Sequence, residues 1–254
     1  MRAMFVALYS VCVYVLFLGT FIYAIGFVEG VFVPKAIDSG ASGNLLTSFA
    51  IDAVLLGLFA VQHSVMARPV FKRVWTRIVP EEAERSTFVL FATAALALLL
   101  WQWRPALQIV WSVDDPMWAD VIRVVSWSGW ALLLASTFLI SHFHLFGLSQ
   151  GFSRILKRGQ PDLAFVMPLF YRWIRHPLYL GFILAFWAAP RMSLGHLFFA
   201  VATTGYILIG IWFEERDLVA QFGERYLAYR ETAGMLLPKL RGPPIARAPR
   251  ETHS

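Results

Sequence analysis

The side chains best suited to catalysis or ligand binding fall into two segments, which contribute Arg175, His176 and Tyr179, and Glu214, Glu215 and Arg216. Each segment borders an apolar run, and the residues between the two runs, 190–195, are of types that reverse the chain. Pro177 suits the first turn of a helix, because the N–H group that proline lacks has no intrahelical partner there. The sequence therefore predicts a helical hairpin whose open end brings the two polar segments together.

Two interpretations of this polar cluster remain open. Arginine, histidine, tyrosine and glutamate often lie at the ends of membrane helices, so the cluster could serve only to anchor the hairpin at the membrane surface. Charged groups at the edge of an apolar phase are costly, however, unless they are paired or hold a ligand. Carboxylates bind an ammonium group and arginine binds a carboxylate, so the cluster also fits a pocket for a zwitterionic or cationic ligand.

The composition indicates that the hairpin belongs to an integral membrane protein. The 254 residues are 58% hydrophobic and only 15% charged, with a mean hydropathy of +0.62, which is too apolar for a soluble globular protein. A membrane-spanning helix needs roughly 20 predominantly apolar residues. The candidate windows, of which the fifth is short, lie at about 4–28, 45–67, 86–103, 121–146, 178–189 and 194–213. The sequence therefore predicts an all-α, polytopic bundle of about six transmembrane helices.

The other segments add little to this architecture. We expect a single membrane domain over residues 1–240, a short cytoplasmic helix within 218–238, and a disordered basic tail over 241–254. The first apolar run is too long and too aromatic for a removable signal peptide, so it is predicted to be the first span. The single cysteine, Cys12, lies in that run, which excludes a disulfide framework and a cysteine-based metal site.

Lysine and arginine are distributed unequally between the two sides of a six-span chain. Eighteen lie on the side that carries both termini, whereas the other side has only Lys35, Arg104, Arg123 and Arg191. Because cytoplasmic loops are enriched in basic residues, both termini are predicted to be cytoplasmic. The same rule accounts for the net charge of +6, so no nucleic-acid partner is expected.

Three histidines, His63, His142 and His144, fall at the cytoplasmic ends of predicted helices, in the same leaflet as the polar cluster. His63 is either a hydrogen-bonded part of the packing or a functional base. Asp52 shares its helical face but lies about three turns away, too far to contact it. A continuous helix would point His142 and His144 in different directions. We therefore expect no metal site, and only one of these two rings to face the polar cluster.

The motifs of the hairpin, R-H-P-x-Y-x-G at 175–181 and E-E-R-x-L at 214–218, together with F-G-x-x-Y-x-x-Y at 222–229, resemble the isoprenylcysteine carboxyl methyltransferase superfamily. Members of that superfamily are integral membrane enzymes that use S-adenosylmethionine. The resemblance implies a cofactor pocket lined by Arg175, His176, Pro177, Tyr179, Gly181, Glu214 and Glu215. In this pocket Gly181 would allow close approach, and Glu214 or Glu215 would be the acidic partner of the cofactor.

A narrower resemblance covers nearly the whole chain. The segments Q-H-S-V-M-A-R at 62–68, S-H-F-H-L-F-G-L-S-Q at 141–150 and R-H-P-L-Y-L-G-F-I-L-A-F-W at 175–187 are similar to the bacterial methanethiol S-methyltransferase family. Members of that family methylate methanethiol to dimethyl sulfide. The Q-H-S-x-M-A segment also resembles the NnrU proteins. The resemblance implies a multi-pass protein of the bacterial inner membrane, with His142, His144 and Gln150 beside the cofactor.

The chemistry implied by this resemblance is an in-line displacement, in which a small thiol attacks the methyl group of S-adenosylmethionine. Because the thiolate is the effective nucleophile, the catalytic candidates are His63 as a base, Arg175 as a source of positive field, and Tyr179 as a ring that contacts the sulfonium. The expected partners are methanethiol and the lipid bilayer, with no obligate protein partner. Two alternatives remain, namely methyl transfer to a larger lipid-like acceptor and a non-enzymatic NnrU-like protein that binds haem or a metal.

Overall fold

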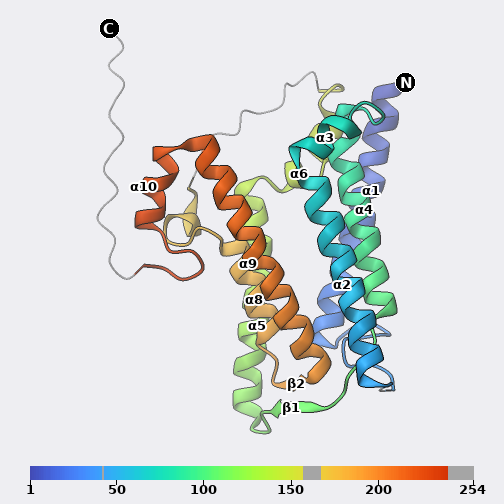
Figure 1. Ribbon diagram of the computed structural model, residues 1–254, viewed down its shortest axis with the longest axis vertical. Helices are drawn as coiled ribbons and strands as arrows, with labels where there is room; N and C mark the ends of the chain where they lie inside the picture. Colours follow the sequence, from blue (N-terminus) through green and yellow to red (C-terminus); the bar gives the residue numbers. More distant parts are fainter. Residues whose placement is uncertain (42, 157–166, 240–254) are drawn as a thin grey trace.

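The computed structural model describes residues 1–41, 43–156 and 167–239, which form an elongated helical bundle (Figure 1). The elements occur in the order α1 (Arg2–Glu29), α2 (Leu45–Ala67), α3 (Pro69–Trp75), α4 (Glu81–Gln102), β1 (Ile109–Ser112), α5 (Pro116–Ile140), α6 (His142–Leu145), α7 (Leu148–Phe152), the 3-10 helix η1 (Leu169–Arg172), α8 (Pro177–Trp187), β2 (Arg191–Ser193), α9 (Leu194–Phe222) and α10 (Glu224–Thr232). The start of α1 and the helices α3, α6 and α10 lie at one end of the bundle, which we call the α10 end. The two strands lie at the opposite end, the strand end.

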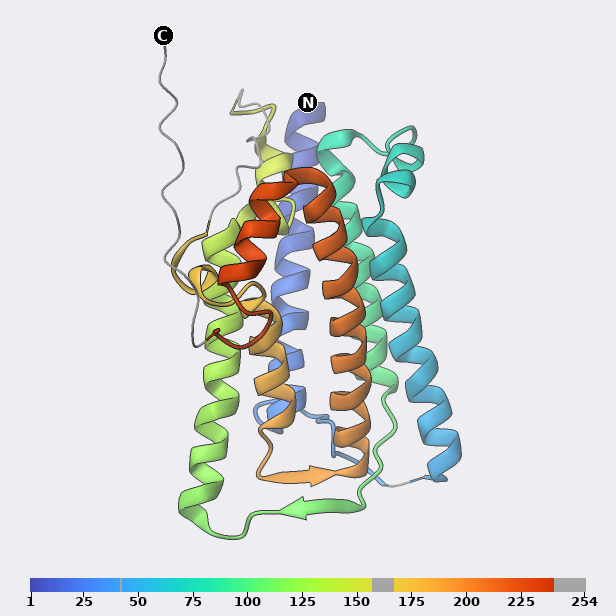
Figure 2. The ribbon, with the colours of Figure 1, turned by 60° about the vertical axis from the view of Figure 1, so that its left-hand side comes forward.

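Five of the described helices, α1, α2, α4, α5 and α9, are long and apolar enough to cross a membrane. They correspond to predicted spans one to four and six, so a multi-pass helical bundle is confirmed. The predicted fifth span corresponds to α8, which has 11 residues and is therefore about 16 Å long. A helix of that length cannot cross a hydrocarbon core of about 30 Å. The non-helical segments before and after α8 lengthen this arm of the hairpin (Figure 2).

The predicted end of the last span is wrong. The apolar run stops at Phe213, but α9 continues to Phe222. The polar residues that follow the run are themselves good helix formers, so leaving the apolar phase does not end the helix. It ends at Gly223, which adopts a positive φ of 53°. Glu214 and Glu215 consequently lie within a continuous helix rather than at its end.

The predicted end of the fourth span is also wrong. We expected the helix to run to Phe146, but α5 ends at Ile140. Ser141 has a φ of 150° and interrupts the helical hydrogen bonding, after which α6 forms a separate turn. His142 and His144 therefore lie beyond the end of α5, and their directions are not set by its helical period.

A two-stranded antiparallel ribbon closes the strand end (Figure 2) and departs from the all-α prediction. Ile109 of β1 lies opposite Ser193 of β2, which ties the α4–α5 connection to the α8–α9 turn. Ser193 also caps α9, because its Oγ accepts a hydrogen bond from the His196 backbone N–H at 3.0 Å. Strands of three and four residues are too short to show a clear period of two, so the sequence pattern did not reveal them.

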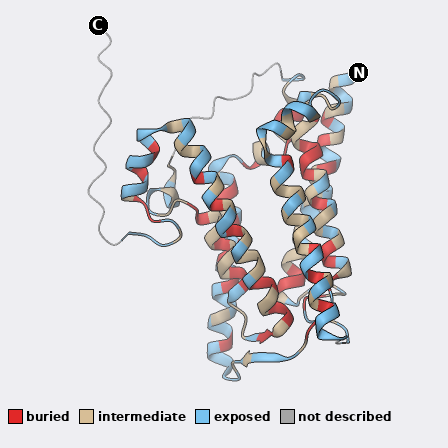
Figure 3. Ribbon diagram, viewed as in Figure 1, coloured by how far each residue is buried: buried red, intermediate tan, exposed pale blue. Residues whose placement is uncertain are grey.

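Apolar side chains fill the space where the helices converge, and the burial pattern of Figure 3 follows their facing sides. The largest buried cluster includes the rings of Phe27, Trp103, Trp130, Phe186 and Phe199. One carboxylate joins this packing. Glu29, at the end of α1, accepts hydrogen bonds from Ser126 Oγ at 2.5 Å and Trp130 Nε1 at 2.7 Å, both on α5. These bonds offset the cost of bringing a carboxylate against the core and hold α1 on α5.

Two glycines bring α5 and α8 into direct contact. A Cβ added to Gly129 would lie 2.6 Å from the carbonyl oxygen of Gly181, and a Cβ added to Gly181 would lie 2.6 Å from that of Gly129. Both distances are shorter than van der Waals contact, so only glycine permits this backbone approach. Gly181 therefore has a packing role, and its approach to a cofactor stays a prediction.

Gly181→Ala and Gly129→Ala are each expected to separate α5 from α8 and to lower the free energy of unfolding by about 1–3 kcal/mol. The measurement is thermal unfolding of the detergent-solubilised protein, followed by circular dichroism. Gly205→Ala in α9 is the matched control, because a Cβ there would meet nothing within 4 Å and alanine is the better helix former. An equal loss of stability in all three variants would contradict the close-packing explanation.

Candidate active site

The segment that leads into α8 is held by backbone pairing with the end of the described chain. Arg175 N–H donates to Gly234 O at 2.8 Å, and His176 N–H donates to Met235 O at 3.1 Å. Gly234 permits the sharp return, because a Cβ on it would lie 1.7 Å from the carbonyl oxygen of Leu237. The chain after α10 therefore returns to the open end of the hairpin and fixes the backbone of Arg175 and His176.

Glu215 is the centre of the polar cluster. Its Oε1 lies 2.7 Å from Arg175 Nε and 3.1 Å from His176 Nε2, and its Oε2 lies 3.3 Å from Arg230 Nε. The side chains of Arg175 and Glu215 are only 9% and 11% exposed. The hairpin thus brings the two polar segments together as predicted, and both oxygens of Glu215 are already engaged within the protein.

Glu214 is the more accessible carboxylate of the pair. Tyr179 Oη donates to its Oε2 at 2.9 Å, and His176 Nδ1 lies 3.8 Å from the same oxygen. The Glu214 side chain is 45% exposed, so part of its carboxylate is accessible to a ligand. Arg216 points elsewhere, with its exposed guanidinium 5.7 Å from the centre of the Trp212 ring. The cluster therefore contains one fully paired acid and one acid that can still receive a ligand.

Residues of α10 complete the cluster, and the sequence analysis missed the most important of them, Arg230. Tyr226 and Tyr229 are buried between α10 and the hairpin, and Tyr229 Oη donates to the backbone oxygen of Tyr171. Burial, together with the nearby Glu215, raises the pKa of Tyr226 to about 12. Arg230 lies one helical turn after Tyr226 and so shares its face, a spacing that could have identified it.

His63 lies on α2, outside the Glu215 cluster. Its ring is stacked 5.4 Å from the Phe59 ring and lies 5.0 Å from the Phe88 ring. Its Nδ1 is buried and has no hydrogen-bond partner among the described residues. The neighbouring Ser64 bonds to Tyr206 Oη of α9 at 3.2 Å. Tyr206 lies on α9, so this bond connects α2 to the helix that carries Glu214 and Glu215.

The other cofactor candidates occupy different positions. His142 uses both ring nitrogens within the fold, one at 2.8 Å from Thr137 Oγ1 and one at 2.9 Å from Tyr14 Oη. This network locks α6 against α1 and α5, which leaves His142 little capacity for a ligand. His144 and Gln150 lie together, since Gln150 Nε2 donates to His144 O at 3.1 Å. Their contact with a cofactor stays a prediction.

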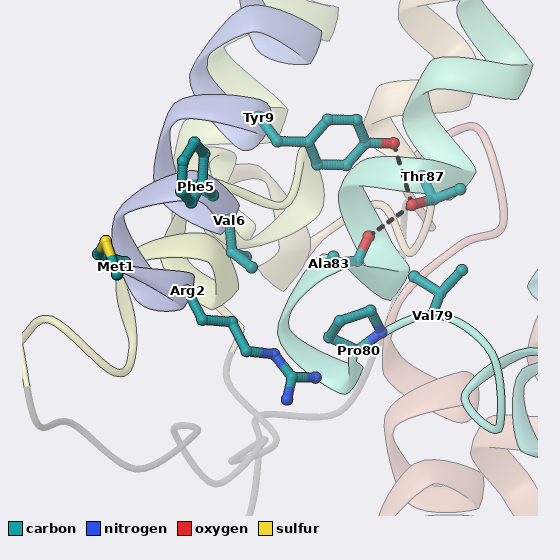
Figure 4. A pocket seen from close by; sticks show the side chains of 9 residues that line it. All are labelled: Met1, Arg2, Phe5, Val6, Tyr9, Val79, Pro80, Ala83 and Thr87. Carbon is teal, nitrogen blue, oxygen red and sulfur yellow. Dashed lines mark hydrogen bonds between the residues drawn. The ribbon is translucent and has the colours of Figure 1, made fainter.

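A surface hollow of about 560 Å³ lies elsewhere at the α10 end, between the start of α1 and the start of α4 (Figure 4). Its lining is almost entirely apolar and includes Phe5, Val6 and Pro80. Tyr9 Oη and Thr87 Oγ1 form a hydrogen bond of 3.0 Å at its edge. No residue of the Glu215 cluster lines this hollow, so it does not contribute to the candidate active site.

Comparison with known proteins identifies close relatives. The chain is 50% identical over 231 residues to methanethiol S-methyltransferase 1 of Bradyrhizobium diazoefficiens, covering 91% of this chain and 81% of the relative. It is 49% identical over 240 residues to the methanethiol S-methyltransferase of Mycobacterium tuberculosis, covering 94% and 98%. Mouse nurim is 31% identical over 188 residues, covering 69% and 70%. No family model matches the chain. No solved structure matches it either.

Proposed function

Because the chain belongs to the methanethiol S-methyltransferase family, we propose that it transfers a methyl group from S-adenosylmethionine to methanethiol and releases dimethyl sulfide. One observation carries this proposal. The chain is 50% and 49% identical to two methanethiol S-methyltransferases, over 91% and 94% of its length. The motifs at 175–181 and 214–218, from which the resemblance started, build the Glu215 cluster.

The donor set of the cluster fits S-adenosylmethionine. That molecule carries two positive groups, a sulfonium and an ammonium, and one carboxylate, and when bound it supplies an electrophilic methyl group. Glu214 offers a half-exposed carboxylate for a positive group, and Arg230, whose side chain is 44% exposed, offers a cation for the carboxylate. Glu215 is better suited to holding Arg175, His176 and Arg230 in place than to binding the cofactor itself.

Tyr179, Arg175 and His63 have roles that follow from their positions and chemistry. The ring of Tyr179, whose hydroxyl is held by Glu214, is suited to contact a sulfonium by cation–π attraction. Arg175 contributes positive field at the base of the cluster. His63 is the candidate base. The packing of α2 on α9 through Ser64 and Tyr206 supports a route by which the methyl acceptor moves from His63 toward the hairpin.

The membrane arrangement is part of the proposal. The basic residues gather at the α10 end, which supports a cytoplasmic position for that end and for both termini. If α8 and the non-helical segments on either side of it together form a fifth crossing, the chain would cross a bacterial inner membrane six times. The cofactor would then reach the Glu215 cluster from the cytosol, and an apolar thiol would reach it through the bilayer or the cytosol.

The decisive test incubates purified, detergent-solubilised protein with S-adenosylmethionine and methanethiol and follows dimethyl sulfide in the headspace by gas chromatography. Product that requires both reagents supports the proposal. Cofactor binding without product would redirect the search to larger, lipid-like acceptors. Absence of both binding and product would overturn the proposal and favour the non-enzymatic alternative.

Glu214→Gln is expected to weaken S-adenosylmethionine binding about tenfold, because a charge-assisted contact is lost while the fold persists. Isothermal titration calorimetry measures the Kd directly. Glu231→Gln, an exposed acidic residue of α10, is the matched control and should leave the Kd unchanged. A Glu214 variant that binds as tightly as the wild type would remove Glu214 from the cofactor site.

A further inference from the structure

Arg85, near the start of α4, is a cation without a counter-ion in the described part of the chain. Its Nε donates to Leu145 O at 2.7 Å, and its guanidinium lies 4.8 Å from the centre of the Phe88 ring. By contrast, Arg68 also lies over a ring, that of Phe213, but has Asp217 as a partner at 3.6 Å. A partly buried guanidinium that stacks on an aromatic ring and lacks an anion is costly unless a ligand supplies one.

Polar atoms without partners occur on residues that are linked to Arg85 by shared contacts. His63 contacts the same Phe88 ring as Arg85, at 5.0 Å between ring centres. His144 directly precedes Leu145, whose carbonyl oxygen accepts the hydrogen bond from Arg85. Gln150 Nε2 donates to the carbonyl oxygen of His144. Among the described residues, His63 Nδ1, His144 Nδ1 and Gln150 Oε1 are buried and make no hydrogen bond. Native structures leave few such atoms unsatisfied, so three of them on residues linked to Arg85, which has no counter-ion among the described residues, point to a ligand site.

The charges around Arg85 favour a small monovalent anion. The groups that interact electrostatically with Arg85 or His144 are His63 of α2, Lys72 of α3 and Glu84 of α4. Burial, and after it the positive charges of Arg85 and Lys72, lower the pKa of His144, which favours its neutral form. Arg85 and Lys72 carry two positive charges against the single negative charge of Glu84, and the Phe59 and Phe88 rings pack against His63. A net charge of +1 beside apolar rings suits a single negative charge on an apolar molecule better than a phosphate.

We propose that Arg85 holds the methyl acceptor as its thiolate, which assigns the acceptor subsite to the buried polar region around Arg85, His63 and His144. This inference rests on the function proposed above. The S–H proton of the thiol passes to a ring nitrogen of His63, and the sulfur keeps the electron pair. That pair forms the new S–CH₃ bond while the bond between the methyl group and the sulfonium of the cofactor breaks. S-adenosylhomocysteine leaves with the electron pair of the broken bond. His63 then returns its proton to solvent.

The position of His63 agrees with this assignment. Ser64, next to His63, is bonded to Tyr206 at 3.2 Å, and Tyr206 lies on α9, the helix that carries Glu214 and Glu215. The acceptor subsite and the cofactor cluster are therefore connected through the packing of α2 on α9.

The test compares the wild type with Arg85→Gln, Arg85→Lys and the control Arg68→Gln. In Arg85→Gln, the KM for methanethiol is expected to rise about tenfold to a hundredfold at pH 7, while the Kd for S-adenosylmethionine stays within about twofold. Its kcat/KM should recover as the pH rises, because more thiolate then exists in solution. Arg85→Lys keeps the charge and should show a smaller rise. Arg68→Gln should match the wild type.

Thiocyanate, a monovalent sulfur anion, is a second probe of the acceptor subsite. It should compete with methanethiol in the wild type and inhibit Arg85→Gln at least about tenfold more weakly, a response that a purely structural residue would not give. An unchanged KM and unchanged inhibition in Arg85→Gln would overturn the inference. So would loss of cofactor affinity in step with acceptor affinity, because Arg85 would then serve the cofactor carboxylate or the fold. Dimethyl sulfide production by the wild type tests the proposed function separately.

Discussion

Glu215→Gln is expected to lower dimethyl sulfide formation at least about a hundredfold and to lower the free energy of unfolding by about 3–5 kcal/mol. The carboxylate of Glu215 is the shared partner of Arg175, His176 and Arg230. Removing its charge leaves two arginines without a counter-ion, one of them only 9% exposed. An unpaired buried charge costs more than the pair contributed, because its desolvation is no longer offset.

Three measurements separate the effects of this substitution. Thermal unfolding reports stability, isothermal titration reports cofactor affinity, and headspace chromatography reports turnover. Glu215→Asp keeps the charge on a shorter side chain and should fall between the wild type and Glu215→Gln in all three. Asp120→Asn is the control, because it removes an ion pair whose side chains are 56% and 72% exposed, and such pairs contribute little. Normal stability and affinity in Glu215→Gln would contradict the central role of Glu215.

Much of the bundle was predictable because a membrane constrains a sequence strongly. The second span was predicted at 45–67, and α2 occupies Leu45–Ala67. The hairpin contact was also predictable, because an antiparallel pair of helices brings residues 175 and 215 to one end, and their opposite charges require pairing. In both cases the determining signal is local in the sequence, either a continuous apolar run or the reversal between two runs.

The missed features depend on packing between distant segments. Arg230 joins Glu215 only because α10 folds back onto the hairpin and Gly234 turns the chain, and no apolar period encodes that return. The break at Ser141 turns His142 toward Tyr14 and Thr137, a placement that the helical period of the predicted fourth span does not indicate. In the sequence, Arg85 is one of the eighteen basic residues on the predicted cytoplasmic side. Only the structure shows that it bonds to the Leu145 carbonyl of α6 and has no counter-ion among the described residues.

His63→Gln is expected to lower kcat about 10²–10⁴-fold at neutral pH, the range typical for loss of a general base. Glutamine fills similar space but cannot accept the thiol proton. His63 makes no hydrogen bond to the described residues and packs between Phe59 and Phe88, so the substitution should cost little stability. The Kd for S-adenosylmethionine should stay unchanged, because the cofactor cluster lies on the hairpin and α10.

The pH dependence distinguishes a base from a packing residue. If His63 generates the thiolate, the deficit of His63→Gln shrinks as the pH rises, because the thiol then ionises without help. His196→Gln serves as the contrast. His196 is buried at the strand end, where its Nε2 lies 3.0 Å from Phe186 O, so its loss should reduce stability and leave kcat unchanged. Unchanged turnover in His63→Gln at neutral pH would remove His63 from the mechanism and leave thiolate formation to the positive charges of Arg85 and Arg175.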